Sequence, residues 1–168
     1  MSLEIHVLAP HEWPEYRELR LEALEHEPQA FGSSYQSMVS RPDEYFEDRL
    51  RQVKTGGDNR LLFARSQENL VGMIGSSRME GTQEHTVNAF YVRKTARGQG
   101  IGKALLKELL TQIAADDAAE TITLHVNKSQ PDAIRIYESA GFQIVSELQD
   151  QMGDAQTHTL VAMSLNLK

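Results

Sequence analysis

The sequence predicts an α/β domain built on a mixed sheet, and three observations support this fold class. Apolar residues recur at four-residue spacing between Ile101 and Ile113, which is typical of an amphipathic helix. Residues 157–167 alternate instead, as a half-buried strand does. Breaks rich in glycine, proline or asparagine divide the rest of the chain into short segments of both kinds. Interspersed helices and strands indicate an α/β architecture.

The N-terminal half is expected to form a strand, two helices and a hairpin, with breaks at Pro28 and at the Thr-Gly-Gly-Asp-Asn run of residues 55–59. Apolar residues on one face predict the first helix, and a proline at its start predicts the second. Short apolar runs bounded by turn residues predict the strands. The expected elements are a strand at residues 3–8, helices at 10–27 and 42–54, strands at 60–65 and 70–78, and an irregular loop at 30–41.

The C-terminal half is expected to alternate strands and helices in the same way. Gly141 follows a helical segment directly, in the C′ position where glycine commonly ends a helix. The expected strands lie at residues 85–92, 121–126, 142–148 and 157–167, and the expected helices lie at 99–115 and 131–140. The complete order is β-α-α-β-β-β-α-β-α-β-β.

Composition narrows the class of protein. The 168 residues are most simply one domain, 1–168, with a full-sized core. The net charge of -7 argues against a nucleic-acid partner. No apolar run reaches about 18 residues, so no membrane span is expected. The absence of cysteine excludes disulfides and thiolate ligands, and with no visible secretory signal it leads us to expect a cytoplasmic protein.

The most informative segment follows the expected strand at residues 85–92. It contains three glycines at alternate positions, Gly98, Gly100 and Gly102, directly before the amphipathic helix. Glycines at a strand-to-helix turn let a ligand approach the backbone, and the N–H groups at a helix N-terminus attract anions. Four cations lie in the same stretch, namely Arg93, Lys94, Arg97 and Lys103. The segment therefore predicts a site for a phosphorylated ligand.

Two familiar phosphate loops do not fit this spacing. A Walker A loop places Ser or Thr after Gly-Lys, whereas Ala104 follows Gly102-Lys103 here. A Rossmann loop requires a third glycine at the position of Leu105, and it normally follows the first strand of the domain.

A third pattern fits. Arg97-x-x-Gly100-x-Gly102 after a strand resembles the coenzyme A loop of the GCN5-related N-acetyltransferases (GNAT). Residues 124–142, with Ala-Ile-x-x-Tyr-Glu on a helix closed by Gly-Phe, resemble a later motif of that family, and residues 19–35 resemble one of its subgroups. The resemblance implies a single N-acetyltransferase domain with a mostly antiparallel sheet flanked by helices. It also implies acetyl-CoA as co-substrate, with no metal.

The resemblance also implies which residues bind the cofactor. Backbone N–H groups of the glycine loop would hold the diphosphate, and the main chain of the preceding strand would pair with the pantetheine arm. For Asn127, a simple turn role is an open alternative to a cofactor contact. At the position of Gln130, the family often has an Asn that contacts the cofactor. The implied cofactor-binding residues are Phe90, Tyr91, Val92, Arg97, Gly98, Gln99, Gly100, Ile101, Gly102, Lys103, Asn127, Gln130 and Tyr137.

Catalysis would need a proton donor for the leaving thiolate and an acceptor for the amine proton. By resemblance Tyr137 lies next to the sulfur, where a phenol can donate a proton; the alternative is an aromatic packed on the helix's buried face. For the base, the position used by histone-acetylating relatives is Thr86, which lacks a basic group. Glu84, two residues earlier on the same strand face, is the candidate, and His85 points the other way. A solvated Glu84, with ordered water as the proton acceptor, stays open.

The expected reaction is transfer of acetyl to a primary amine of a small molecule by direct attack in a ternary complex. Alternatives are acetylation of a protein N-terminus or lysine, and a non-catalytic acyl-CoA sensor. A homodimer is left open. Two acidic groups, if they rim the acceptor cleft, favour a polyamine or amino sugar; otherwise they are solvated helix faces. They are Glu22, Glu25 and Glu27, and Asp43, Glu44, Glu47 and Asp48.

Overall fold

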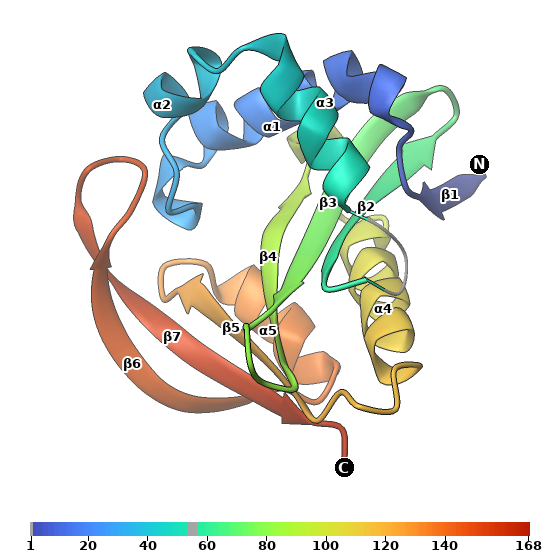
Figure 1. The fold of residues 1–168 in the computed structure, drawn as a ribbon. Helices are drawn as coiled ribbons and strands as arrows, with labels where there is room; N and C mark the ends of the chain where they lie inside the picture. The colour runs from blue at the N-terminus through green and yellow to red at the C-terminus, as the bar shows by residue number, and fades with distance from the viewer. Residues whose placement is uncertain (1, 54–56) are drawn as a thin grey trace.

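Figure 1 shows the computed structural model, which describes residues 2–53 and 57–168. Seven strands form one sheet in the order β1-β2-β3-β4-β5-β7-β6. All neighbouring strands pair antiparallel except β4 and β5, which are parallel. The strands are β1 (Leu3–His6), β2 (Asn59–Ser66), β3 (Asn69–Arg78), β4 (Glu84–Val92), β5 (Thr121–Asn127), β6 (Gln143–Gln151) and β7 (Thr157–Asn166).

Helices cover both faces of the sheet (Figure 1). One hydrophobic cluster lies between the sheet and α1 (Trp13–His26), α2 (Tyr35–Val39) and α3 (Asp43–Gln52). A second cluster lies on the opposite face, under α4 (Ile101–Ala114) and α5 (Pro131–Ser139). The apolar stripe of α4 is buried as its spacing predicts, so the predicted mixed, mostly antiparallel sheet flanked by helices is confirmed.

The element order agrees with the prediction, with one correction in the first loop. Residues 30–41 do not form a wholly irregular segment, because α2 lies within them. Ser34 begins this helix by accepting a hydrogen bond from the backbone N–H of Ser37 at 3.1 Å, a capping interaction that stabilises even a short helix. The expected helix end at Lys54 and the break that begins at Thr55 lie outside the described residues. Within the described part of the chain, no helix is long and apolar enough to cross a membrane.

The two central strands separate part-way along their length. β4 pairs with β5 only from Glu84–Thr121 to Thr86–Thr123. Beyond this point β4 carries a bulge against β3, where the register shifts between Met73 and Gly75. Ala89 lies in the bulge with φ of +54°, a left-handed conformation that is uncommon outside glycine. Because a bulge bends its strand, it accounts for β4 turning away from β5 and opening a gap in the sheet.

Candidate active site

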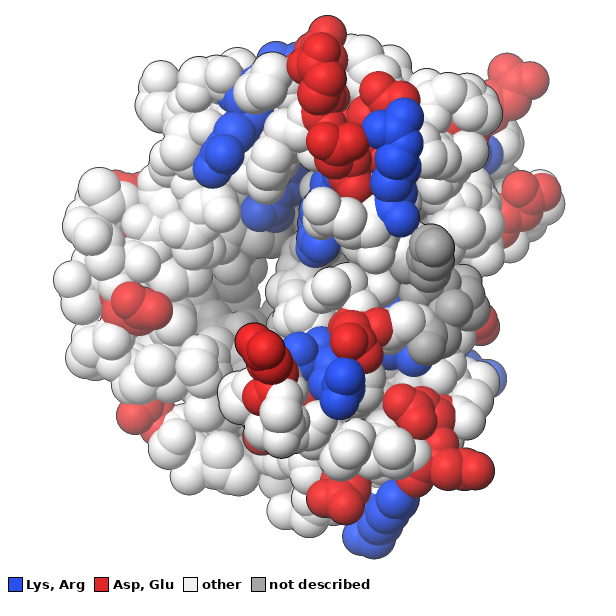
Figure 2. All heavy atoms as spheres, in the orientation of Figure 1, with Lys and Arg blue, Asp and Glu red and all other residues white. Residues whose placement is uncertain are grey.

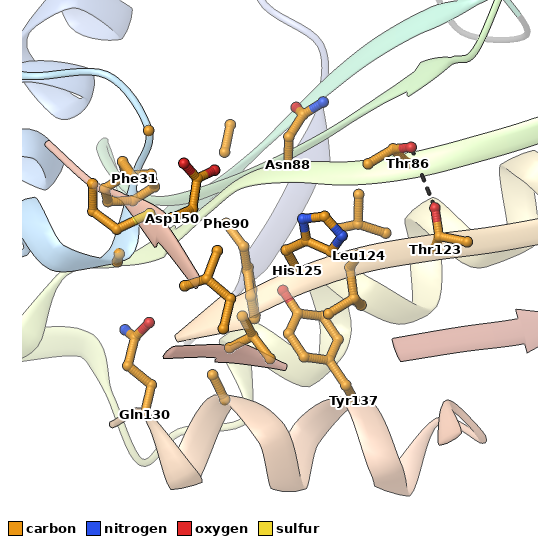
Figure 3. A pocket seen from close by; sticks show the side chains of 18 of the residues that line it. Phe31, Thr86, Asn88, Phe90, Thr123, Leu124, His125, Gln130, Tyr137 and Asp150 are labelled. Carbon is orange, nitrogen blue, oxygen red and sulfur yellow. Dashed lines mark hydrogen bonds between the residues drawn. The ribbon is translucent and has the colours of Figure 1, made fainter. Parts of the chain in front are cut away.

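A cavity of about 630 Å³ lies at the gap between β4 and β5. Its walls come from both strands, from α5, from the segment between α1 and α2, and from the β6–β7 hairpin. Figure 3 shows Asn88 of β4, His125 of β5 and Tyr137 of α5 around the same space. The cavity therefore brings together elements that are far apart in the sequence.

Tyr137 is held rigidly at the cavity wall. Its ring packs against Phe90 and Phe142, with centroids 5.7 Å away in each case. The side chain is 5% exposed and borders the cavity, into which its hydroxyl points (Figure 3). That hydroxyl has no hydrogen-bond partner among the described residues. Burial raises the pKa of the Tyr137 phenol above its ordinary value, so Tyr137 remains a neutral proton donor.

The end of α5 fixes the position of this tyrosine. Gly141 has φ of +103°, and its N–H donates to the carbonyl of Glu138 while the N–H of Phe142 donates to the carbonyl of Tyr137. These two bonds are the Schellman motif that a C′ glycine allows, as the sequence predicts. The motif also brings the Phe142 ring onto the Tyr137 ring, so a local turn signal orients the candidate proton donor.

The glycine loop presents a row of free donors. The N–H groups of residues 98–103 donate to no acceptor in the described part of the chain, whereas the N–H groups on either side of this row, those of Arg97 and Ala104, are both bonded. Gly98 and Gly100 have φ of +79° and +81°, and a Cβ at either would meet open space. The row ends at the N-terminus of α4, which is the positive end of the helix. Six N–H groups without acceptors in the described residues are suited to an anion at this position, and binding of the cofactor diphosphate there remains a prediction.

Gly102 is required for a different reason from its two neighbours. The sequence suggests that a side chain here would block the ligand. In the structure, a Cβ at Gly102 would instead lie 3.1 Å from the Phe90 ring. This glycine therefore allows α4 to approach β4, and Phe90 in turn supports Tyr137.

Two of the basic residues around the loop pair with carboxylates of α1 and of the residue that follows it. Arg97 pairs with Glu27 at 2.6 Å, donates to the carbonyl of Val92 at 2.9 Å, and lies over the Tyr91 ring. Arg93 lies 3.4 Å from Glu22. These arginines therefore organise the loop, and the cations without a carboxylate partner in the described residues are Lys94, Lys103 and Lys107.

The two acidic groups named in the sequence do not rim the cavity, so the hypothesis that they select a cationic acceptor is wrong. None of the seven carboxylates in the two acidic groups borders the cavity. Glu22 and Glu27 face the basic loop, and Glu47 and Asp48 pair with Arg51 on α3. The carboxylates that do border the cavity are Glu84 and Asp150. The two acidic groups thus give no support for a polyamine or amino sugar.

The three predicted pantetheine contacts on β4 point their side chains in different directions. Phe90 borders the cavity. Tyr91 is 2% exposed in the core under α1, and its hydroxyl donates to Glu22 at 3.0 Å, whereas Val92 packs against the α4 core. Because β4 and β5 are unpaired beyond Thr86, the main chain of this stretch faces the gap. Pairing of that main chain with a cofactor remains a prediction.

Glu84 lies at the closed end of the gap. Its carboxylate accepts a hydrogen bond from the Thr123 hydroxyl at 2.9 Å, and Thr123 lies 3.3 Å from the Thr86 hydroxyl (Figure 3). Glu84 borders the cavity, while His85 is buried on the opposite face of the strand with 1% exposure. The geometry brings a carboxylate to the cavity, and its role as base remains a prediction.

Residues 30–33, between α1 and α2, form a roof over one end of the cavity, and Asn127 supports this roof. Its Nδ2 donates to the carbonyl of Gln29 at 2.9 Å, and its Oδ1 accepts from the backbone N–H and hydroxyl of Ser129. These bonds support the turn role for Asn127, and a cofactor contact is untested. Gln130 borders the cavity (Figure 3). Its position is therefore compatible with the predicted contact to the cofactor.

The β6–β7 hairpin completes this roof. The N–H of Gly153 donates to the carbonyl of Phe31 at 2.7 Å. A Cβ at Gly153 would lie 2.3 Å from the carbonyl oxygen of Ser33, so only glycine allows this approach. The hairpin and the segment between α1 and α2 thereby enclose one end of the cavity.

Sequence reasoning missed several residues that the fold brings to the cavity. Asn88 on β4 and His125 on β5 face the same space (Figure 3). Arg20 of α1 and Asp150 of β6 border it as well. Alternation along the strands gives a weak signal for Asn88, His125 and Asp150, but no local pattern places these residues or Arg20 at one cavity. In the described residues, no group of three His, Asp or Glu side chains is placed to hold a metal ion.

A family model described as an acetyltransferase (GNAT) domain matches residues 23–165, which is most of the chain. The chain belongs to the GNAT acetyltransferase family. This membership agrees with the resemblance seen in the glycine loop and in the Tyr137 segment.

The GNAT chain is also similar to individual proteins. It is 36% identical over 89 residues to the N-alpha-acetyltransferase RimI of Mycobacterium tuberculosis, a match that covers 52% of the chain and 54% of RimI. The chain therefore spans about half the length of this curated relative. Among solved structures, a GNAT acetyltransferase from Streptococcus pneumoniae has a TM-score of 0.86 at 17% identity, covering 99% of this chain and 100% of that one.

A further solved structure, YncA from Salmonella typhimurium, contains its cofactor acetyl-CoA. It has a TM-score of 0.82 at 15% identity and covers 100% of this GNAT chain and 95% of its own. At such low identity these two structures establish the fold alone.

Proposed function

We propose that this GNAT domain transfers the acetyl group of acetyl-CoA to a primary amine of a small molecule by direct attack in a ternary complex. The observation that supports this proposal best is the unpartnered Tyr137 hydroxyl in a cavity that opens where β4 leaves β5. The free N–H groups of residues 98–103 add a site for the cofactor's diphosphate. The RimI relative and the acetyl-CoA-bound YncA structure support acetyl transfer from acetyl-CoA, and neither favours a small acceptor.

The proposed chemistry assigns one proton transfer to each side of the cavity. The amine nitrogen attacks the thioester carbonyl carbon, an N–C bond forms, and the C–S bond breaks. Tyr137 donates its proton to the departing sulfur, a role that its buried neutral phenol suits. Glu84 accepts the proton that the amine loses, held in place by the Thr123 hydroxyl. Free CoA and an N-acetyl amine are the products.

A small acceptor is favoured over a protein by the roof of the cavity. Gly153 and Asn127 tie the segment between α1 and α2 to the sheet and the hairpin, which restricts the space for an extended chain. Acetylation of a protein N-terminus is the second candidate, because the RimI relative is named as an N-alpha-acetyltransferase. Release of CoA with an amine panel, compared with a panel of peptides, separates the two and distinguishes either from a non-catalytic sensor.

Acetyl-CoA is expected to bind in the absence of metal. The glycine loop supplies backbone donors, and Lys103 supplies positive charge beside them, so a divalent ion is not required for the diphosphate. Isothermal titration calorimetry with and without a chelator measures this. Loss of binding on chelation, or no binding at all, would contradict the cofactor assignment.

Glu84→Gln is expected to lower kcat by about 10²–10⁴-fold, because the amide accepts no proton while keeping the size of the side chain. His125→Gln removes another polar side chain of the cavity wall and should leave kcat within about twofold of wild type. Steady-state turnover at saturating acceptor, measured for the three proteins, tests the assignment. If His125→Gln lowers kcat and Glu84→Gln does not, the assignment of Glu84 is wrong.

A further inference from the structure

The charge inside the cavity is unequally distributed. Arg20, on α1, borders the cavity from the helical layer, and Glu84 borders it from the start of β4. Figure 2 shows a hollow between the helical layer and the β6–β7 hairpin, with Lys and Arg atoms at its helical end and charged atoms of both signs at its opposite end. The cavity therefore offers a cation and a carboxylate to one occupant.

Arg20 has no carboxylate partner within the described residues. Its guanidinium lies 5.2 Å above the Phe31 ring, and its Nη1 is buried without a hydrogen bond. The titratable groups that act on the Arg20 guanidinium are Tyr16, Tyr45 and Arg49, none of which carries a carboxylate. An arginine remains charged even when burial disfavours the charge, and a buried charge without a partner is costly. An anionic group from outside the protein would satisfy it.

Arg20 contrasts with the arginines near the glycine loop. Arg93 is paired with Glu22 of α1, and Arg97 is paired with Glu27 directly after that helix. Asp150 also borders the cavity, but it is exposed on the edge strand and accepts from the N–H of Gln151. The cation that remains available inside the cavity is thus the one on α1.

We propose that the acceptor is a small primary amine that carries a carboxylate, and that Arg20 binds this carboxylate. The amine then extends toward Glu84 and Tyr137, on the other walls of the cavity. Arginine suits this role because its planar guanidinium forms two parallel hydrogen bonds with a carboxylate. This inference rests on the proposed acetyltransferase function and specifies its substrate class.

The test compares acids with matched amines that lack the carboxylate. L-Leucine and 5-aminopentanoate are compared with L-leucinamide and pentylamine, and spermine represents a polycation. Release of CoA gives kcat/KM for each. At least one of the two acids should be preferred over its matched amine by about 10- to 100-fold, as expected for one charge-assisted interaction. The two acids differ in the separation of amine and carboxylate, so either spacing is detected.

Two variants assign the preference to Arg20. Arg20→Met should lower kcat/KM for the preferred acid by about 10- to 100-fold and leave kcat/KM for the amines without a carboxylate within about twofold of wild type. Arg20→Lys keeps the charge and should restore part of the preference. Arg17→Met is the matched control, because Arg17 lies on the same helix over an aromatic ring and has a buried unpaired nitrogen, but does not border the cavity. It should leave the preference unchanged.

The outcomes separate the two levels of the proposal. Wild-type protein that uses leucinamide, pentylamine or spermine as well as the acids contradicts the inference alone, without reference to any variant. An acid preference that persists in a folded Arg20→Met protein also contradicts it. CoA release with none of the amines contradicts the proposed function, and the inference falls with it. Melting temperatures identify a variant that fails to fold, and the wild-type comparison then decides.

Discussion

Tyr137→Phe is expected to lower kcat by about 10²–10⁴-fold, the usual contribution of a positioned general acid. The substitution removes the hydroxyl that points into the cavity and keeps the ring that packs against Phe90 and Phe142. Acetyl-CoA affinity should change by less than about twofold, since the hydroxyl acts on the leaving sulfur. Steady-state turnover with the best acceptor and calorimetry with acetyl-CoA measure the two quantities.

The control for this variant is Tyr16→Phe. Tyr16 is also buried, with 6% exposure, but it lies in the core between α1 and the sheet. Removal of the Tyr16 hydroxyl in Tyr16→Phe should leave kcat unchanged. If kcat of Tyr137→Phe lies within about twofold of wild type, Tyr137 is not the proton donor, and water protonates the leaving sulfur.

The wild-type pH profile gives an independent check. A general acid is active while protonated, and burial raises the pKa of Tyr137 above its ordinary value. The protonated form therefore persists to higher pH than in a free phenol. Turnover should show no alkaline decline from this group below a pH of about 10. A decline near neutral pH that disappears in Tyr137→Phe would contradict the environment described for the ring.

Gly100→Val is expected to weaken acetyl-CoA binding by about 100-fold or more, as loss of two charge-assisted hydrogen bonds would do. Gly100 has φ of +81° directly before α4. A β-branched residue strongly disfavours this conformation, so the loop would turn its N–H groups away from the diphosphate. The new side chain would also occupy the open space above the loop. Calorimetric titration with acetyl-CoA measures the change.

Gly81→Val is a matched control, because Gly81 has φ of +75° and open space around it, but lies in the turn between β3 and β4. Both variants should lose a similar amount of stability, roughly 1–3 kcal/mol for one strained residue. The Gly100 variant alone should lose affinity. Unchanged affinity in a folded Gly100→Val protein would place the diphosphate elsewhere.

The parts of the site that the sequence predicts are those encoded within a few residues. Gly98 and Gly100 belong to one turn, and their positive φ follows from the chemistry of a glycine in a strand-to-helix connection. Gly141 and Phe142 form a helix end with its own local hydrogen bonds, and this end orients Tyr137. Helical spacing likewise predicts the buried face of α4. Each signal depends only on neighbours along the chain.

The parts that sequence reasoning missed depend on contacts between distant segments. Ala89 adopts a positive φ although nothing in its side chain requires it; pairing with β3 imposes the bulge. Glu22 and Glu27 meet Arg93 and Arg97 because α1 packs over the end of β4. Glu22 and Glu27, which look available in the sequence, are therefore already paired with arginines in the fold.

By itself, the sequence determined the fold class and the order of strands and helices apart from α2, because periodicity and turn chemistry act over short distances. It also predicted an anion-binding loop, and the resemblance to the GNAT family predicted the candidate proton donor. Only the tertiary structure decided that β4 leaves β5 beyond Thr86, that Gly153 and Asn127 build a roof, and that Arg20 and Glu84 border one cavity. These features arise where strand pairing and helix packing bring segments together, and the free energy of those contacts depends on the whole fold rather than on any local pattern.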